Sequence, residues 1–259
     1  MFFETSDGTQ LFYQTYGQQG HPPIVLLHGL GADHQMFSPQ FEKYANQGFN
    51  VIVPDLRGHG KTSKVESLTL SDWTSDIKEL LDHLGIERTI LLGVSMGGVI
   101  IQKFVTQYPH RVEKMVISDS FGEIKSFPEK AVAKGTVIGF KIFKYLPKKW
   151  AAALVSSAYK DYNDISQEYF RDTTLKVDFE QIILARKAIN QIDVLDDLQQ
   201  VDIPALILVG DGAEIMIKTS KKIVDSLNNS SLQVIQGGFD PSNLVQPEQF
   251  DRAVLNFIK

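Results

Sequence analysis

The sequence of 259 residues contains no cysteine, which excludes several kinds of chemistry at once. Without cysteine there are no disulfides, no thiol nucleophile and no cysteine ligands for a metal. No apolar run approaches the roughly 20 residues that a membrane-spanning helix needs. The first residues, which run from Met1 into the turn at Asp7-Gly8, lack the basic, apolar and small-residue order of a signal peptide. We therefore expect a cytoplasmic protein that makes no contact with a membrane.

Basic residues and histidines are also scarce. The chain has 26 Lys and Arg against 31 Asp and Glu, which gives a net charge of −5 and argues against binding to nucleic acid. Its six histidines are scattered without the spacing of metal ligands, and none follows His110. We therefore expect neither a metal nor a cofactor, and a small molecule as the partner. The 43% hydrophobic content suffices for one large core.

Short apolar runs alternate with helical patterns along most of the chain. Met1–Thr5 and Leu11–Tyr16, joined by Asp7-Gly8, are typical of an antiparallel hairpin. Six further runs are continuously apolar, as in strands buried on both faces of a parallel sheet: Ile24–Leu27, Val51–Pro54, Thr89–Leu92, Lys114–Ser118, Ala205–Val209 and Leu232–Ile235. The pattern predicts an α/β protein with a mostly parallel, eight-stranded sheet covered by helices on both faces.

Four segments between or after these strands carry apolar residues at helical spacing: Leu70–Leu84, Met96–Tyr108, Thr219–Leu227 and Pro247–Ile258. Ser71 is in a suitable place to cap the first of them, and Pro247 to begin the last. The alternation of strands and helices stops between residues 121 and 198, where the pattern is helical and rich in aromatic residues. We expect a core made of residues 1–120 and 199–259, and a helical cap over the ligand-binding edge of the sheet made of residues 121–198. Its aromatic side chains are expected to form a core of the cap and to line a pocket.

The most specific motif is Gly93-Val94-Ser95-Met96-Gly97, which follows an apolar strand and opens a helical stretch. A serine exposed at such a sharp turn needs small residues on both sides, because larger ones collide with the neighbouring strand or helix. Between a strand and a helix, the G-x-S-x-G pattern indicates a nucleophilic serine.

Three other motifs occur in a fixed order around this one. His28-Gly29-Leu30-Gly31 follows the third expected strand, Pro54–Gly60 contains a D-x-R-G-x-G turn after the fourth, and Ser242-Asn243-Leu244 precedes the last helix. With these motifs the whole chain resembles the α/β-hydrolase fold family, specifically its capped, esterase-like branch. The resemblance implies acyl transfer, in which Ser95 attacks an ester carbonyl. It also implies that the backbone amides of Leu30 and Met96 hold the oxyanion that forms.

The sequence departs from the family at the two remaining positions of the catalytic triad. The acid is expected after the seventh strand in the pattern G-x-x-D, but Gly210-Asp211-Gly212-Ala213 puts Ala213 there. The histidine is expected two residues before Ser242-Asn243, where Asp240 stands. Alanine at 213 avoids the repulsion of two neighbouring carboxylates. Because the surrounding motifs are intact, the two replacements indicate selection or engineering rather than drift.

Asp240 is a weak substitute for histidine, since an ordinary Asp has a pKa of about 3.9 and an ordinary His about 6.5. Burial under a cap would narrow this difference. The other candidates for the missing groups are a relay through His34, and the acids Asp119, Asp211 and Glu214, none of which helps without a histidine.

Three functions follow from this reading. The first is a carboxylesterase-type serine hydrolase with a disabled or altered triad, acting on an apolar ester. The second is a site repurposed so that Asp240 abstracts a proton or drives an elimination. The third is binding of a small molecule without catalysis.

Overall fold

The computed structural model describes all residues, 1–259, and contains one eight-stranded sheet in the order β1-β2-β4-β3-β5-β6-β7-β8. β1 and β2 pair antiparallel, β2 runs antiparallel to β4, and the remaining neighbours are parallel. The strands are β1 Phe2–Glu4, β2 Gln10–Tyr16, β3 Pro23–Leu27, β4 Asn50–Pro54, β5 Thr89–Val94, β6 Val112–Ser118, β7 Ala205–Gly210 and β8 Ser230–Ile235. The predicted hairpin, the six further strands and the mostly parallel sheet are confirmed.

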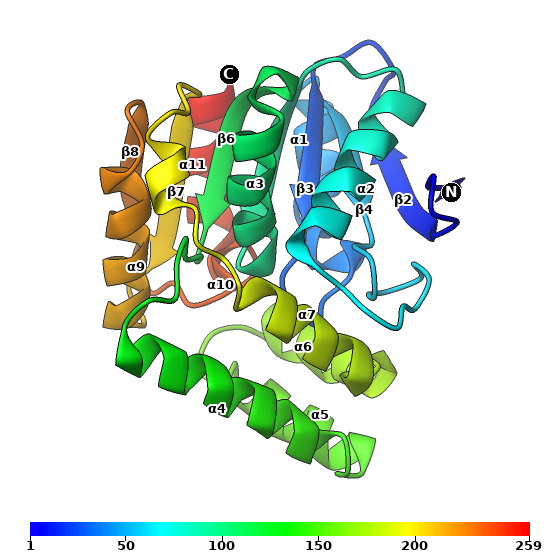
Figure 1. Cartoon of the computed structure of the whole chain (residues 1–259), viewed down its shortest axis with the longest axis vertical. Coiled ribbons are helices and arrows are strands. Elements are labelled where there is room, and N and C mark those ends of the chain that lie inside the picture. The colour runs from blue at the N-terminus through cyan, green and yellow to red at the C-terminus, as the bar shows by residue number, and fades with distance from the viewer.

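Helices cover both faces of this sheet (Figure 1). One face packs against α2, α3, α8 and α9, and the other against α1, α10 and α11. The α-helices are α1 Phe41–Asn46, α2 Leu70–His83, α3 Met96–Gln107, α4 Phe127–Phe143, α5 Lys148–Ser157, α6 Asp164–Lys176, α7 Phe179–Ile189, α8 Leu195–Leu198, α9 Glu214–Asp225, α10 Ser242–Val245 and α11 Pro247–Ile258. None of them is long and apolar enough to cross a membrane. Cytoplasmic localisation stays a prediction.

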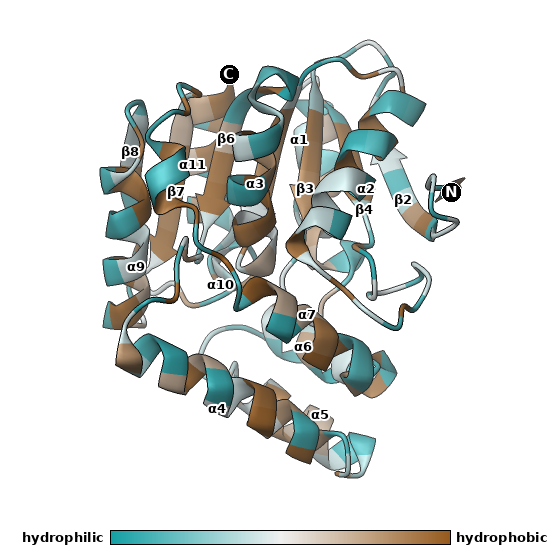
Figure 2. Ribbon diagram, in the orientation of Figure 1, coloured by the Kyte–Doolittle hydropathy of each residue, from teal (hydrophilic) through white to brown (hydrophobic).

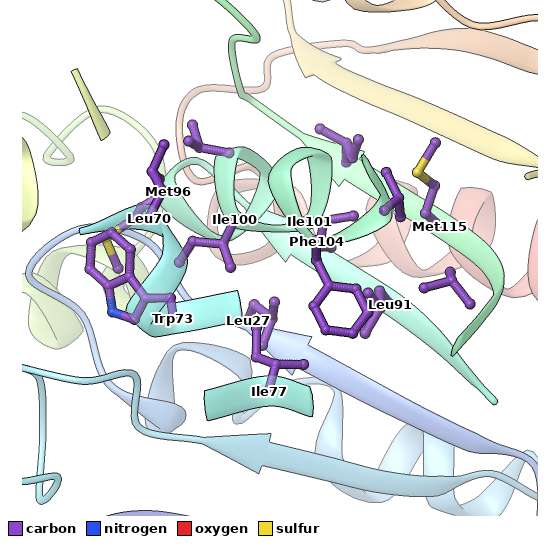
Figure 3. Packing of buried hydrophobic residues seen from close by; sticks show 14 of the residues in the cluster. Leu27, Leu70, Trp73, Ile77, Leu91, Met96, Ile100, Ile101, Phe104 and Met115 are labelled. Carbon is purple, nitrogen blue, oxygen red and sulfur yellow. The ribbon is translucent and has the colours of Figure 1, made fainter. Parts of the chain in front are cut away.

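The core on the first face is built around α3, whose first turn follows the serine motif. Met96, Ile100, Ile101 and Phe104 of this helix are fully buried. In Figure 3 they pack among side chains of the sheet and of α2, including Trp73. Side chains of this size each contribute about 1.5–3 kcal/mol when removed from water. The start of α3 is therefore held in a fixed position against the ends of β3, β5 and β6.

Two predictions about helix ends were wrong. The helix expected over Thr219–Leu227 begins at Glu214, because its first turn contains the consecutive apolar residues Ile215, Met216 and Ile217, which do not follow a helical spacing. The cap of α2 is Thr69 and not Ser71, since Thr69 and Asp72 form a reciprocal capping box. The short helices α1, α8 and α10 have too few residues for a periodic pattern to reveal them.

Between β6 and β7 the chain forms helices and no strand, only an isolated bridge between Glu123 and Asp193. Helices α4 to α7, called the cap helices below, lie beyond the end of the sheet toward which β6 points (Figure 1). Figure 2 shows that their surface alternates between hydrophobic and hydrophilic residues, whereas the central strands are uniformly hydrophobic. The division into a core and a cap of residues 121–198 stays a prediction.

The aromatic residues of the cap helices and their connections divide into two groups. Tyr159 is buried and its ring stacks on Phe170 at 4.2 Å between centroids. Phe127, Tyr145 and Trp150 are between 70% and 86% exposed on the outside. Tyr159 and Phe170, the inner group, line a cavity together with Ser95. The sequence shows one aromatic-rich segment and does not distinguish these two groups.

Candidate active site

Ser95 lies in the turn between β5 and α3 and has backbone angles of φ 53° and ψ −113°. This left-handed φ is costly for a residue other than glycine, and it persists because the surroundings fix the turn. A Cβ on Gly93 would lie 2.4 Å from the Gly97 carbonyl carbon, and one on Gly97 would lie 2.0 Å from the Leu27 oxygen. The steric requirement predicted for the G-x-S-x-G motif is therefore met in the fold.

The loop after β3 lies directly beside the serine. A Cβ on Gly29 would be 3.5 Å from the Cβ of Ser95. The backbone N–H of Leu30 donates to no acceptor in the protein. Met96 is the first residue of α3, and the first N–H groups of a helix have no partner within it. The two amides predicted to hold an oxyanion are thus available near Ser95, and the positive end of the α3 dipole favours an anion there.

Asp240 forms a hydrogen bond with the serine: the Ser95 hydroxyl donates to Asp240 Oδ2 at 3.0 Å. Asp240 lies in the loop between β8 and α10, so the two residues are brought together from positions 145 apart in the sequence. The Tyr159 hydroxyl donates to the backbone oxygen of Asp240 at 3.0 Å, which ties this loop to the cap. Of the sequence-predicted site residues, Ser95 and Asp240 therefore form a hydrogen-bonded pair.

Asp119, weighed in the sequence only as a replacement acid, organises the loop that carries Asp240. It follows β6, is 2% exposed and has a φ of 51°. Its carboxylate accepts from the Ser242 N–H at 2.9 Å, the Ser242 hydroxyl at 3.0 Å and the Gly210 N–H at 2.9 Å. The sequence signal for this role is a polar residue directly after a buried strand, opposite the Ser242-Asn243 motif.

The environment raises the pKa of Asp240 to about 8. Burial is the main cause, since it disfavours the charged form, and the negative charge of Asp119 adds to it. The hydrogen bond from Ser95 acts in the opposite direction, because it stabilises the carboxylate. The sequence-based expectation that burial narrows the basicity gap to histidine is consistent with this shift.

We expect Asp240→Asn to make the protein more stable at alkaline pH. The native state holds the Asp240 proton up to about pH 8, whereas an unfolded Asp releases it near pH 4. The wild type should therefore lose at most about 2.7 kcal/mol of unfolding free energy between pH 6 and 9.5, less any screening by solvent at the partly exposed carboxylate. Asp240→Asn should lack this loss, and thermal unfolding at both pH values measures it. The exposed Asp211→Asn is the control, and an equal loss in wild type and Asp240→Asn would contradict the shift.

Ala213 is the N-cap of α9, and no side chain caps that helix. The preceding turn contacts the loop of Asp240, with the Gly212 N–H donating to the Gly238 oxygen at 2.9 Å. The rings of Tyr162 and Phe239 stack at 5.4 Å, and atoms of both lie within 3.3 Å of a Cβ placed on Gly212. The expected acid position therefore adjoins the Asp240 loop, but it offers no carboxylate and is flanked by aromatic rings.

None of the histidines forms a hydrogen bond with the Ser95 hydroxyl. His34 Nδ1 lies 2.7 Å from Asp55 Oδ1, and its other nitrogen contacts Gln35, so the relay through His34 is not formed. His28 accepts from the Leu56 N–H at 3.0 Å. Burial lowers the pKa of His59 to about 3, which keeps that ring neutral. These three side chains hold the loops around β3 and β4 together.

A cavity of about 180 Å³ lies over Ser95 and Asp240. Its inner end is formed by the loop after β3 and its roof by the cap helices and their connections. The lining residues are Gly29, Leu30, Ala32, Met36, Ser95, Thr136, Phe140, Tyr159, Phe170, Arg186, Ile189, Asp240 and Pro241. Arg186 of α7 was missed in the sequence, because a single cation on an amphipathic helix carries no signal of its own.

Comparisons with known proteins agree with this architecture. The family model described as alpha/beta hydrolase fold matches residues 22–137. The chain is 26% identical to "3-oxoadipate enol-lactonase 1" of Acinetobacter baylyi, over 97% of this chain and 94% of that protein.

Two solved structures superpose along the whole chain. The enol-lactonase of Burkholderia xenovorans LB400 gives a TM-score of 0.88 at 22% identity, covering 100% of this chain and 99% of that one. A structure from a study of carboxylesterases of Nitrososphaera gargenis gives 0.89 at 21% identity, covering 100% and 97%. At these identities the solved structures show the fold alone. Together with the sheet order and the turn at Ser95, the matches establish that the chain has the α/β-hydrolase fold.

Proposed function

We propose that the protein is a serine hydrolase of carboxylesterase type in which Asp240 takes the place of the histidine base. The observation that carries this proposal is the 3.0 Å hydrogen bond from the Ser95 hydroxyl to the Asp240 carboxylate. It lies beside two available backbone amides and at the floor of a cavity. The relative that is named as an enol-lactonase supports chemistry on a cyclic ester.

In the proposed reaction, ionised Asp240 accepts the hydroxyl proton while Ser95 Oγ forms a bond to the ester carbonyl carbon. The amides of Leu30 and Met96 hold the resulting oxyanion. The tetrahedral intermediate then expels the alcohol, which takes the proton back from Asp240. A water molecule repeats the sequence on the acyl-enzyme, releasing the acid and restoring Ser95 and Asp240.

The raised pKa of Asp240 makes this role chemically sensible. At a pKa of about 8 the carboxylate is far more basic than an ordinary Asp, and its basicity lies near that of histidine. The cost is that only about one molecule in ten carries the ionised base at pH 7. The active form also places two anions, Asp119 and Asp240, close together. We therefore expect slow turnover at neutral pH, in line with a compromised or altered triad.

A fluorophosphonate ester tests the proposal, because it labels a serine only where the hydroxyl is activated and the oxyanion is held. We expect one adduct, located on Ser95 by peptide mass spectrometry, that forms faster as the pH rises through 8. Ser95→Ala should give no adduct, and Asp240→Asn should slow labelling by about 10²-fold or more, the lower end of the effect of a general base. The other serines of the chain serve as internal controls. Labelling that Asp240→Asn leaves unchanged would overturn the role of Asp240.

The same carboxylate favours a second candidate, proton abstraction from a carbon acid. A buried carboxylate with a raised pKa is suited to this chemistry, and the two free amides would stabilise an enolate. In that case Asp240→Asn abolishes turnover of the carbon acid, whereas Ser95→Ala retains it. The serine hydrolase requires both residues, so the pair of variants separates the two functions.

A further inference from the structure

Arg186 is a cation in the roof of the cavity without a partner in the protein. The Arg186 side chain forms no ion pair and donates no hydrogen bond to another residue of the protein. The Nε atom is fully buried and has no acceptor. A guanidinium has five N–H donors and stays charged, so burying the Nε–H without an acceptor is unfavourable, and the remaining donors are free to bind a ligand.

The surroundings of Arg186 do not account for it. The guanidinium lies 5.9 Å from the centre of the Phe121 ring, a distance at which a cation–π contact contributes about 0.5–1 kcal/mol. Apart from Arg186, the cap helices contribute Thr136, Phe140, Phe170 and Ile189 to the cavity lining, and none of these residues is acidic. The carboxylate of Asp240, which lines the same cavity, is not within ion-pair distance. Burial lowers the pKa of Arg186, which shows how little the protein compensates its charge.

We propose that Arg186 binds a carboxylate group on the substrate, so that the cavity holds an acid with the scissile ester at its other end. The inference rests on the proposed function, because it places the ester at Ser95. Guanidinium and carboxylate match in shape and pair through two parallel hydrogen bonds. A cavity of about 180 Å³ is small for a ligand site, which indicates a short substrate. The expected apolar ester is thereby refined to a short ester whose distal end carries a carboxylate.

Binding of unreactive analogues tests this without any turnover. The probes are the monoamides of succinate, glutarate and adipate, each compared with its diamide, so that one end changes from carboxylate to neutral amide. The protein is the Ser95→Ala variant, and isothermal titration calorimetry at pH 6.5 gives the affinities. We expect one chain length to bind at least tenfold more tightly as the monoamide, as a charged hydrogen-bonded pair requires.

Arg186→Met should remove this preference, and Arg186→Lys should retain part of it. Arg252→Met is the matched control. Arg252 is exposed on α11, so this substitution removes the same charge at a site away from the cavity. Equal affinities of monoamide and diamide at every chain length would overturn the proposal without requiring any variant. A preference that survives in Arg186→Met would assign Arg186 to packing on Phe121. Because Ser95 is absent from this experiment, its failure leaves the fluorophosphonate result, and hence the serine hydrolase, untouched.

Discussion

Hydrolysis of a short-chain p-nitrophenyl ester should rise at least about 10²-fold in kcat/KM when Ala213→Asp and Asp240→His are combined. In a well-studied serine protease, loss of the histidine costs about a millionfold, and the oxyanion hole alone leaves about a thousandfold over water. The turn, the two amides and the serine are already in place here. Asp240 lies 3.0 Å from the Ser95 hydroxyl, so an imidazole at 240 starts from a position next to the nucleophile. The measurement is initial-rate kinetics at pH 8.

The single variants separate the two contributions. Asp240→His alone should gain less than the pair, because nothing fixes the orientation of the imidazole or stabilises its charged form. Ala213→Asp alone should gain nothing, since it adds a negative charge near Asp119 and Asp240. The gain of the pair should therefore exceed the product of the single effects, as expected for residues that act together. If neither single variant nor the pair exceeds the wild type, the cavity does not suit activated esters, and proton abstraction or binding becomes the better proposal.

The fold and the position of Ser95 could be predicted from the sequence because local rules govern both. Continuous apolar runs specify strands buried on both faces, and the glycines at 93 and 97 have no alternative at contacts of 2.4 and 2.0 Å. The prediction that Ala213 and Asp240 stand at the positions of the acid and the histidine rests on their spacing from neighbouring motifs. Each of these features lies within a few residues of the sequence pattern that predicts it.

Features that depend on tertiary contacts could not be predicted from the sequence. The importance of Asp119 arises from Gly210 and Ser242, which lie 91 and 123 residues away in the sequence. The pKa of Asp240 depends on how deeply the folded protein buries its carboxyl group. Arg186 has no ion-pair partner because no acidic residue of another helix lines the cavity beside it. No periodicity or spacing encodes such quantities, because they belong to the assembled pocket.

The pH dependence of the residual ester hydrolysis should identify the base. We expect kcat/KM to fall about tenfold per pH unit below 8 and to level off above it, because only ionised Asp240 accepts the serine proton. Asp240→Asn should lower the plateau by about 10²-fold or more and remove the inflection near 8, since an amide has no basic form. In the Ala213→Asp/Asp240→His pair the inflection should move to lower pH, toward the ordinary histidine value of about 6.5.

Two features of the design make this profile a strict test. Ser95→Ala gives the background due to hydroxide, which also increases with pH but has no plateau and is subtracted. Arg252→Met gives the effect of a changed net charge without any change in the cavity, and should leave the inflection near 8. An inflection that persists in Asp240→Asn would assign the titration to another group, and the proposed proton transfer would then fail. The inflection could also be absent in Asp240→Asn while Ser95→Ala still turns over carbon acids. That result would support the second candidate function, in which Asp240 abstracts a proton from carbon.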